Sequence, residues 1–189
     1  MASLRGVRVG IRTIVGNYVR FGPRCACGNR NWLIKSAVVC SRCKRKIKEK
    51  VTAYILAGPK CACGNRDWFV ASSSVICSAC GRRQDVKVHG YIVNGPLCAC
   101  GNRDWFVGES NRWSREHEYS VGILRRVRWS SDRLERESGA RCSACGRWRV
   151  VQVRGFIVNG PKCSCGNRDY LVGKSGIRCS RCGRLSTWR

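Results

Sequence analysis

Sixteen cysteines occur along this chain in four sets of four, and each set consists of a C-x-C pair followed by a C-S-x-C pair. The sets are Cys25, Cys27, Cys40 and Cys43; Cys61, Cys63, Cys77 and Cys80; Cys98, Cys100, Cys142 and Cys145; and Cys163, Cys165, Cys179 and Cys182. Four thiolates delivered as two close pairs form the ligand set of a closed structural zinc site, in which tetrahedral zinc takes sulfur at about 2.3 Å. The sequence therefore predicts four small metal-binding modules in a row, with one zinc ion in each.

Two other uses of these cysteines stay open. Disulfides suit an even cysteine count in a secreted scaffold, but no apolar signal segment precedes the repeats and C-x-C pairs are awkward to bridge. Iron held by four thiolates, as in a rubredoxin-like electron carrier, would use the same residues. The grouping of every set into two close pairs favours zinc over both.

The spacing within a set indicates a β-hairpin. Twelve residues separate the two pairs in the first set and 13 in the second and fourth, enough for two short strands and a turn. With this spacing the chain resembles the zinc-ribbon family, although the usual ribbon has C-x-x-C in both knuckles. The resemblance covers Cys25–Cys43, Cys61–Cys80, Cys98–Cys145 and Cys163–Cys182. It implies a small all-β, metal-stabilised fold: a tandem array of four zinc ribbons with an insertion in the third.

A second reason to expect metal is the size of the repeating unit. The first cysteines of the first three sets, Cys25, Cys61 and Cys98, lie 36 and 37 residues apart. Units this short rarely bury enough apolar surface to offset the entropy of the chain. Metal binding is expected to supply the missing folding free energy, on the order of 10 kcal/mol per site.

The repeat divides the chain into five parts. These are a basic arm (1–17) and ribbons at 18–50, 51–88, 89–153 and 154–189, the third carrying an insertion at 109–139. Alternating apolar residues run from one ribbon into the next, which predicts structured linkers and a semi-rigid, elongated array. The insertion is expected either to extend the hairpin and pack on a neighbouring module, or to form a basic finger with Arg125, Arg126 and Arg128.

The charge of the chain indicates a polyanionic partner. There are 37 Lys and Arg against 11 Asp and Glu, a formal net charge of +26. Most of the acids lie in the insertion, and three more, Asp67, Asp104 and Asp169, belong to the repeated motif. Nucleic acid is the expected partner. A membrane surface is not, because no amphipathic basic helix or lipidation signal is visible.

Two repeated sets of arginines are the candidate nucleic-acid contacts. Arg30, Arg66, Arg103 and Arg168 follow the first knuckle, and Arg45, Arg82, Arg147 and Arg184 follow the last cysteine by two residues. Phosphate contact or base stacking is one expected role, together with the arginines of the insertion. Neutralising the negative charge of the metal site is the other. The three motif aspartates are expected to hold the arginine that precedes each of them.

Two further repeated positions have structural roles in this interpretation. The asparagines of the first knuckle are expected to bond to their own loop; they are Asn29, Asn65, Asn102 and Asn167. The aromatic residues that follow are expected to form the small apolar core of each ribbon rather than stack on bases; they are Trp32, Trp68, Trp105 and Tyr170.

These observations favour a structural RNA-binding protein in a reducing intracellular compartment, the cytoplasm first. The family resemblance implies a component of a ribosome or another large ribonucleoprotein, with neighbouring proteins as further partners. The alternative is a transcriptional or architectural DNA-binding protein, disfavoured because no helix is expected between the cysteine pairs to enter a major groove. A protein-interaction adaptor would not require so much positive charge. An enzyme is not expected, because no phosphate-binding glycine loop, activated nucleophile or open metal site is apparent.

Overall fold

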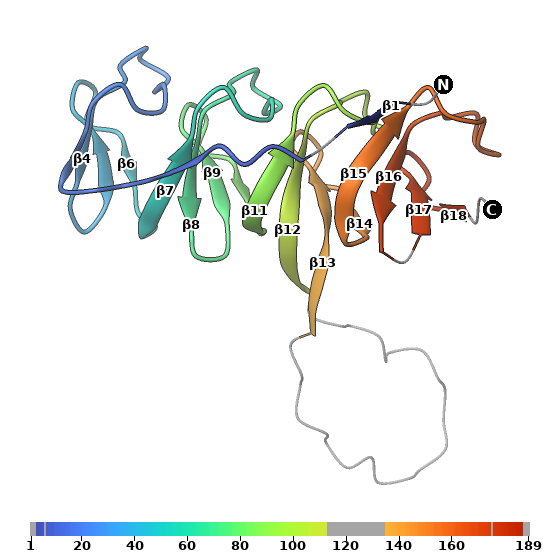
Figure 1. The fold of residues 1–189 in the computed structure, drawn as a ribbon. Helices are drawn as coiled ribbons and strands as arrows, with labels where there is room; N and C mark the ends of the chain where they lie inside the picture. The colour runs from blue at the N-terminus through green and yellow to red at the C-terminus, as the bar shows by residue number, and fades with distance from the viewer. Residues whose placement is uncertain (1–2, 6, 113–134, 175, 187–189) are drawn as a thin grey trace, which may run out of the picture.

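A computed structural model of the chain describes residues 3–5, 7–112, 135–174 and 176–186. All secondary-structure elements in these ranges are β-strands, and the strands form four antiparallel sheets set in a row (Figure 1). The predicted all-β array of four modules is therefore confirmed. Most of the insertion, including Arg125, Arg126 and Arg128, falls outside the described residues. Among the residues described, no helix has the length and apolarity needed to span a membrane.

Each sheet is built around one cysteine-bearing hairpin. The first sheet has the order β3-β4-β5-β6, with β3 at Tyr18–Val19, β4 at Trp32–Ile34, β5 at Val38–Cys40 and β6 at Lys46–Ile47. The second has the order β10-β9-β8-β7-β2, with β2 at Ile11–Thr13, β7 at Val51–Ile55, β8 at Trp68–Ala71, β9 at Val75–Cys77 and β10 at Arg83–Gln84.

The other two sheets repeat this plan. The third has the order β11-β12-β13-β14, with β11 at Lys87–Ile92, β12 at Trp105–Arg112, β13 at Glu135–Cys142 and β14 at Trp148–Val150. The fourth has the order β1-β15-β16-β17-β18, with β1 at Ser3–Arg5, β15 at Val153–Val158, β16 at Tyr170–Gly173, β17 at Gly176–Cys179 and β18 at Leu185–Ser186. The described ends of the insertion lengthen the third hairpin, because β12 and β13 stay paired as far as Arg112 and Glu135.

The apolar cores lie between the sheets. In β8, Trp68 and Val70 join a cluster with Phe106 of the third sheet, whereas Phe69 joins a cluster with Trp32 of the first. The rings of Trp32 and Phe69, and those of Trp68 and Phe106, meet edge to face with centroids 4.8 Å apart. Successive strand residues point to opposite faces, so an inner sheet that is covered on both sides needs an unbroken apolar run. The motif tryptophans are thus buried, but in cores that neighbouring modules share rather than in a core of their own ribbon.

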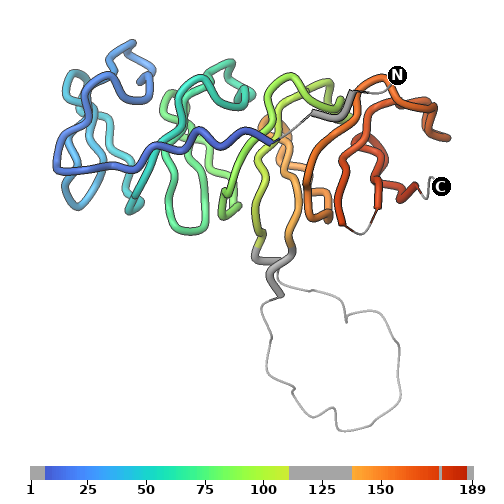
Figure 2. The backbone as a smooth tube through the Cα atoms, in the orientation of Figure 1, coloured from blue at the N-terminus to red at the C-terminus, as the bar shows by residue number. Residues whose placement is uncertain are grey.

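The N-terminal arm crosses the modules in reverse order (Figure 2). Strand β1 pairs with β15 of the fourth sheet, Arg8 forms an isolated bridge with Tyr91 of the third, and β2 pairs with β7 of the second. The Arg8 and Tyr91 backbones exchange hydrogen bonds of 2.8 and 2.9 Å. The arm therefore ties the modules together along one side and covers sheet edges that would otherwise be open to pairing with other chains.

Gly90 lets the arm approach the third sheet closely. A Cβ at this position would lie 2.7 Å from Val7 Cγ1 and 3.0 Å from the Arg8 carbonyl oxygen. We expect Gly90→Ala to displace the arm and to lower the free energy of unfolding by about 1–3 kcal/mol. Limited trypsin digestion checks this: cleavage after Arg8 or Arg12 should become faster than in the unaltered protein. Gly16→Ala is the control, because nothing lies within 4 Å of a Cβ there, although its φ of 77° adds local strain. Equal cleavage rates for the Gly90 variant and the unaltered protein would contradict the close approach.

Candidate metal centres

The fold brings each predicted cysteine set together. Within every set the four sulfur atoms lie within 4.8 Å of one another. Facing pairs are closer: Cys25 and Cys43 Sγ are 3.6 Å apart, and Cys27 and Cys40 Sγ are 3.7 Å apart. A regular tetrahedron with metal–sulfur bonds of about 2.3 Å has sulfur atoms about 3.8 Å apart. All sixteen cysteines are free thiols, so the disulfide alternative is wrong for this structure. Each set could hold one metal ion, and the geometry is consistent with zinc.

Tight turns form both knuckles. In the first module the Gly28 amide donates to the Cys25 carbonyl at 2.9 Å, and Gly28 has a φ of 84°. In the second knuckle the Lys44 amide donates to the Cys40 carbonyl at 3.1 Å, and Lys44 has a φ of 61°. This left-handed conformation favours glycine. Glycine occupies the first position in all four modules and the second position in three of them; the eight residues are Gly28, Gly64, Gly101, Gly166, Lys44, Gly81, Gly146 and Gly183.

The knuckle asparagine joins the two knuckles. Asn29 Nδ2 donates to the Asn31 carbonyl of its own loop at 2.8 Å, as expected, and to Ser41 Oγ of the second knuckle at 3.0 Å. It also lies 3.3 Å from Cys40 Sγ. The other modules repeat the contact to sulfur, through Asn65 and Cys77, Asn102 and Cys142, and Asn167 and Cys179, each at 3.4 Å. The side-chain donor to the metal-site sulfur is therefore the asparagine amide, and no described arginine side chain donates to these sulfurs.

These donors favour the thiolate form of one cysteine in each module. At Cys77 the contact with Cys61 lowers the pKa most, burial opposes it, and N–H donors that include Asn65 help to bring it to about 4. At Cys40 burial raises the pKa, but the amide of Cys43 and the side chain of Asn29 outweigh it, so the pKa falls to about 6. Burial instead raises the pKa of Cys25 to about 12. In both of these sites one sulfur therefore ionises more readily than an ordinary cysteine, and the thiolate is the form that binds a metal.

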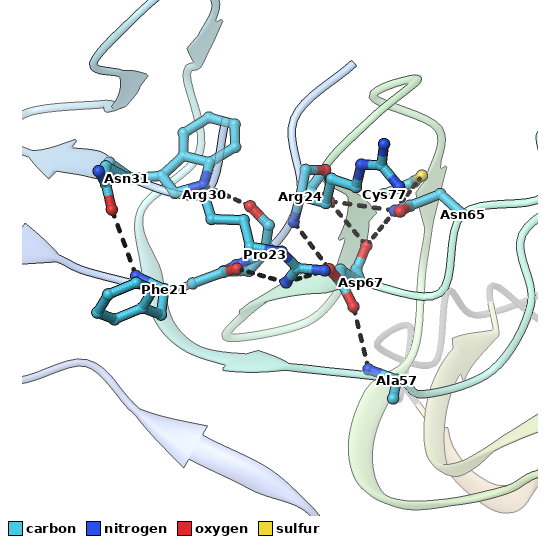
Figure 3. A network of polar contacts seen from close by, with 12 residues as sticks. Phe21, Pro23, Arg24, Arg30, Asn31, Ala57, Asn65, Asp67 and Cys77 are labelled. Carbon is cyan, nitrogen blue, oxygen red and sulfur yellow. Dashed lines mark hydrogen bonds and ion pairs between the residues drawn. The ribbon is translucent and has the colours of Figure 1, made fainter. Parts of the chain in front are cut away.

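Asp67 of the second module joins that module to the first (Figure 3). The Asp67 carboxylate is buried, and its Oδ2 accepts hydrogen bonds from the Arg24 backbone at 2.8 Å and Arg30 Nη1 at 3.1 Å, both in the first module. Its Oδ1 accepts the backbone N–H of Ala57 in its own module at 3.0 Å. Ser78 of the second module then donates to the Arg24 carbonyl at 2.7 Å. We call this arrangement the carboxylate clamp: an arginine and the residue before the first cysteine grip the Asp and Ser of the next module.

The carboxylate clamp recurs at the other two interfaces. Between the second and third modules, Lys60 and Arg66 donate to Asp104 at 2.7 and 3.0 Å, and Ser143 donates to the Lys60 carbonyl at 2.8 Å. Between the third and fourth, Leu97 and Arg103 both donate to Asp169 at 2.9 Å, and Ser180 donates to the Leu97 carbonyl at 2.8 Å. The prediction that each aspartate holds the preceding arginine is wrong. Each holds the arginine of the module before it, because the short loop turns its own arginine toward the next interface.

Three comparisons, with protein-family models, curated proteins and solved structures, gave no match to this chain. The zinc-ribbon resemblance therefore stays a resemblance of motif and spacing. What the structure adds is independent of it: four complete sets of four sulfur ligands, held in knuckles and linked by a repeated carboxylate clamp.

The second set of arginines is placed differently from the first. Arg82 and Arg147 are exposed, and their side chains make no hydrogen bond to any residue the structure describes. Arg184 is also exposed and donates to Ser164 Oγ of its own module. Arg45 is half-buried and donates to the Ala79 carbonyl of the second module. Three of these four guanidinium groups are therefore open to a partner, whereas Arg30, Arg66 and Arg103 are held in the carboxylate clamps.

Sequence reasoning missed one exposed aromatic residue. Phe21 is 78% exposed and has a left-handed φ of 52°. The corresponding residues of the later modules are Ala57, Asn94 and Asn159, which share that backbone conformation. A bulky exposed residue there has no packing role to offset its strain, and Arg20 and Arg24 flank it in the sequence. The signal in the sequence was the mismatch between Phe21 and these three small or polar residues.

Proposed function

We propose that this protein is a structural, zinc-dependent RNA-binding protein of a ribosome or another large ribonucleoprotein. Four zinc ions, one for each set of cysteines, hold the modules in shape, and the exposed arginines contact RNA phosphates. A reducing compartment, the cytoplasm first, fits sixteen free thiols that must stay available to metal. Binding to duplex DNA is the alternative.

The observation that carries this proposal is the pairing of the acidic side chains. Six acidic residues have side-chain contacts that the structure describes, and all six form ion pairs within the protein; they are Glu49, Asp67, Asp85, Asp104, Glu109 and Asp169. Only five Lys and Arg are needed to pair with them; they are Arg30, Arg66, Arg83, Lys87 and Arg103. The described modules thus offer a polyanion a surface whose carboxylates are already paired with basic side chains.

The repeat supports contact at several separated points. Arg82, Arg147 and Arg184 occupy the same place in successive modules, and each is exposed. Stacked sheets lie about 10 Å apart, so this arrangement offers one guanidinium for every such step along the array. Phe21, at the outer end of the first module, is a candidate platform for an unpaired base, since base–aromatic stacking tolerates any sequence. Backbone contacts at regular points with a stacking site at one end suit a folded RNA.

RNA is preferred over DNA because of the elements that the modules present. Knuckle loops and short sheet edges carry the free arginines, and most base-reading DNA modules instead insert a helix into the major groove. A rigid array of exposed cations can follow the phosphates of a folded RNA without reading bases. The same attraction between basic side chains and phosphates would bind duplex DNA, so the affinities for RNA and DNA must be compared at one salt concentration.

The test measures the affinity of the zinc-loaded protein for structured RNA and duplex DNA across a salt series. With six to ten phosphates contacted, the logarithm of affinity should fall with the logarithm of salt with a slope of roughly −5 to −9. Arg82→Ala and Arg147→Ala should each reduce the steepness by about 1, with Gln152→Ala as the exposed neutral control. A flat salt response would end the nucleic-acid proposal, and tighter binding to DNA would favour the alternative.

A further inference from the structure

The carboxylate clamp gives every module two different faces. The donor face carries the arginine and the backbone of the residue before the first cysteine, as Arg30 and Arg24 do in the first module. The acceptor face carries the aspartate and the serine, as Asp67 and Ser78 do in the second. Because each interface joins a donor face to an acceptor face, a row of four modules ends with one unused face of each kind.

The unused donor face belongs to the fourth module. Arg168 is exposed, and no described residue accepts a hydrogen bond from its guanidinium. The backbone N–H and carbonyl of Lys162 are likewise without a partner in the described part of the chain. Pro161 is exposed here, whereas the prolines at the three internal donor faces, Pro23, Pro59 and Pro96, are all buried. The groups that bind a carboxylate at three interfaces are thus present a fourth time, and no residue that the structure describes occupies them.

The unused acceptor face of the first module lacks the matching charge. Asn31 stands where the later modules have aspartate, and its Oδ1 accepts only the Phe21 backbone N–H, at 3.3 Å. Ser41 is present at the serine position, and Leu33 is only partly buried where Phe69 and Leu171 are fully buried. The first module therefore keeps the hydroxyl and the apolar side chain of an acceptor face but not its carboxylate. The first module of a second copy therefore cannot supply the anion that the donor face binds.

We propose that the donor face of the fourth module is a docking site for a partner protein that presents a carboxylate beside a hydroxyl on an apolar surface. The internal interfaces define the chemistry of this ligand: an oxygen anion 2.7–3.1 Å from the arginine and backbone donors, and a hydroxyl 2.7–2.8 Å from the carbonyl. Because Asn31 lacks a carboxylate, the first module of another copy does not occupy this site. This inference does not depend on the RNA-binding function.

The paired donors and acceptor favour a protein ligand over a phosphate. At each internal interface a hydroxyl group satisfies the carbonyl next to the carboxylate, as Ser143 does for Lys60. An ionised phosphodiester brings acceptors only, so a nucleic acid would need a ribose 2′-hydroxyl in the right place to satisfy the Lys162 carbonyl. The neighbouring surface of the fourth sheet includes Val172 and Ile177, which are only partly buried. An apolar surface on the partner would cover these residues, as the next module does at each internal interface.

The decisive experiment restores the missing carboxylate with Asn31→Asp in the zinc-loaded full chain. The variant has both halves of the carboxylate clamp, at opposite ends, so it should associate head to tail into open chains. Sedimentation velocity at rising protein concentration should show the average mass of Asn31→Asp at least doubling, while the unaltered protein and Asn31→Ala stay monomeric. Adding Arg168→Ala should abolish the association, and adding Lys174→Ala, an exposed cation of the same module, should not. A monomeric Asn31→Asp variant at every concentration would overturn the proposal.

Measurement of RNA binding is a second test of the docking proposal. If Arg168→Ala lowers the salt slope for RNA as much as Arg82→Ala does, the donor face contacts phosphate and the protein-docking proposal is overturned. We expect an unchanged slope for Arg168→Ala and a lowered slope for Arg82→Ala. The far-ultraviolet circular dichroism and zinc content of each variant should match those of the unaltered protein, which separates loss of binding from loss of fold.

Discussion

Removal of metal from all four centres is expected to unfold the whole array. Each module has strands of only two to eight residues, and its cysteine sulfurs hold the two knuckles together. Metal binding contributes on the order of 10 kcal/mol per site in small metal-held domains, which exceeds the usual stability of a module this size. A strong chelator should therefore abolish the sheet signal in circular dichroism and make all sixteen thiols reactive. Elemental analysis of the untreated protein should give four zinc ions per chain.

Single substitutions show whether the modules depend on one another. Cys77→Ser damages the second centre, whose sheet packs on both the first and the third, whereas Cys182→Ser damages the last centre in the row. We expect Cys77→Ser to lower the melting temperature of the whole protein and Cys182→Ser to affect mainly the fourth module. Retention of native structure after complete metal removal would show that apolar packing alone is sufficient.

The second large effect is expected from Asp104→Ala. Asp104 is 2% exposed, and its carboxylate accepts hydrogen bonds from Lys60, Arg66 and Asn94. Its removal leaves two backbone N–H groups without an acceptor, while Arg66 is exposed enough to be hydrated. An unsatisfied buried N–H costs about 1–3 kcal/mol, so we expect a loss of about 3 kcal/mol in the free energy of unfolding. Chemical denaturation with guanidinium chloride measures it.

The first module supplies the matched control for Asp104→Ala. Asn31 occupies the same motif position but accepts a single, more exposed hydrogen bond. Asn31→Ala should therefore cost less than about 1 kcal/mol. Equal effects of the two substitutions would mean that the aspartate matters for its own loop and not for joining modules.

The metal centres could be predicted from the sequence because their information is local. In three of the four sets, twelve or thirteen residues separate the C-x-C and C-S-x-C pairs, which fits only a short hairpin, and the third set carries the insertion between its pairs. The partner of each aspartate could not be predicted in the same way. Asp67 follows Arg66 directly, yet it pairs with Arg30 of the preceding module. Only the stacking of one sheet on the next decides between the two arginines.

The shared apolar cores, too, could be predicted only in part from the sequence. Burial of the motif tryptophans could be predicted from their type and repetition, and Trp32, Trp68 and Trp105 are indeed fully buried. That Phe69 completes the core of the preceding module follows from the face to which it points, which depends on the neighbouring sheet. The sequence alone did not indicate what the N-terminal arm pairs with, because its partners lie far along the chain.

The path of the arm bears on how the protein is made. Strand β1 is synthesised well before its partner strand β15, so the two strands cannot pair until synthesis has reached the fourth sheet. Modules one to three can acquire metal and stack as they emerge, but the arm must wait for the fourth sheet before it can close over the row. A chain released before the fourth sheet is made would keep a loose, trypsin-sensitive arm. Docking of the arm on β15 thus shows that all four modules have been reached by synthesis.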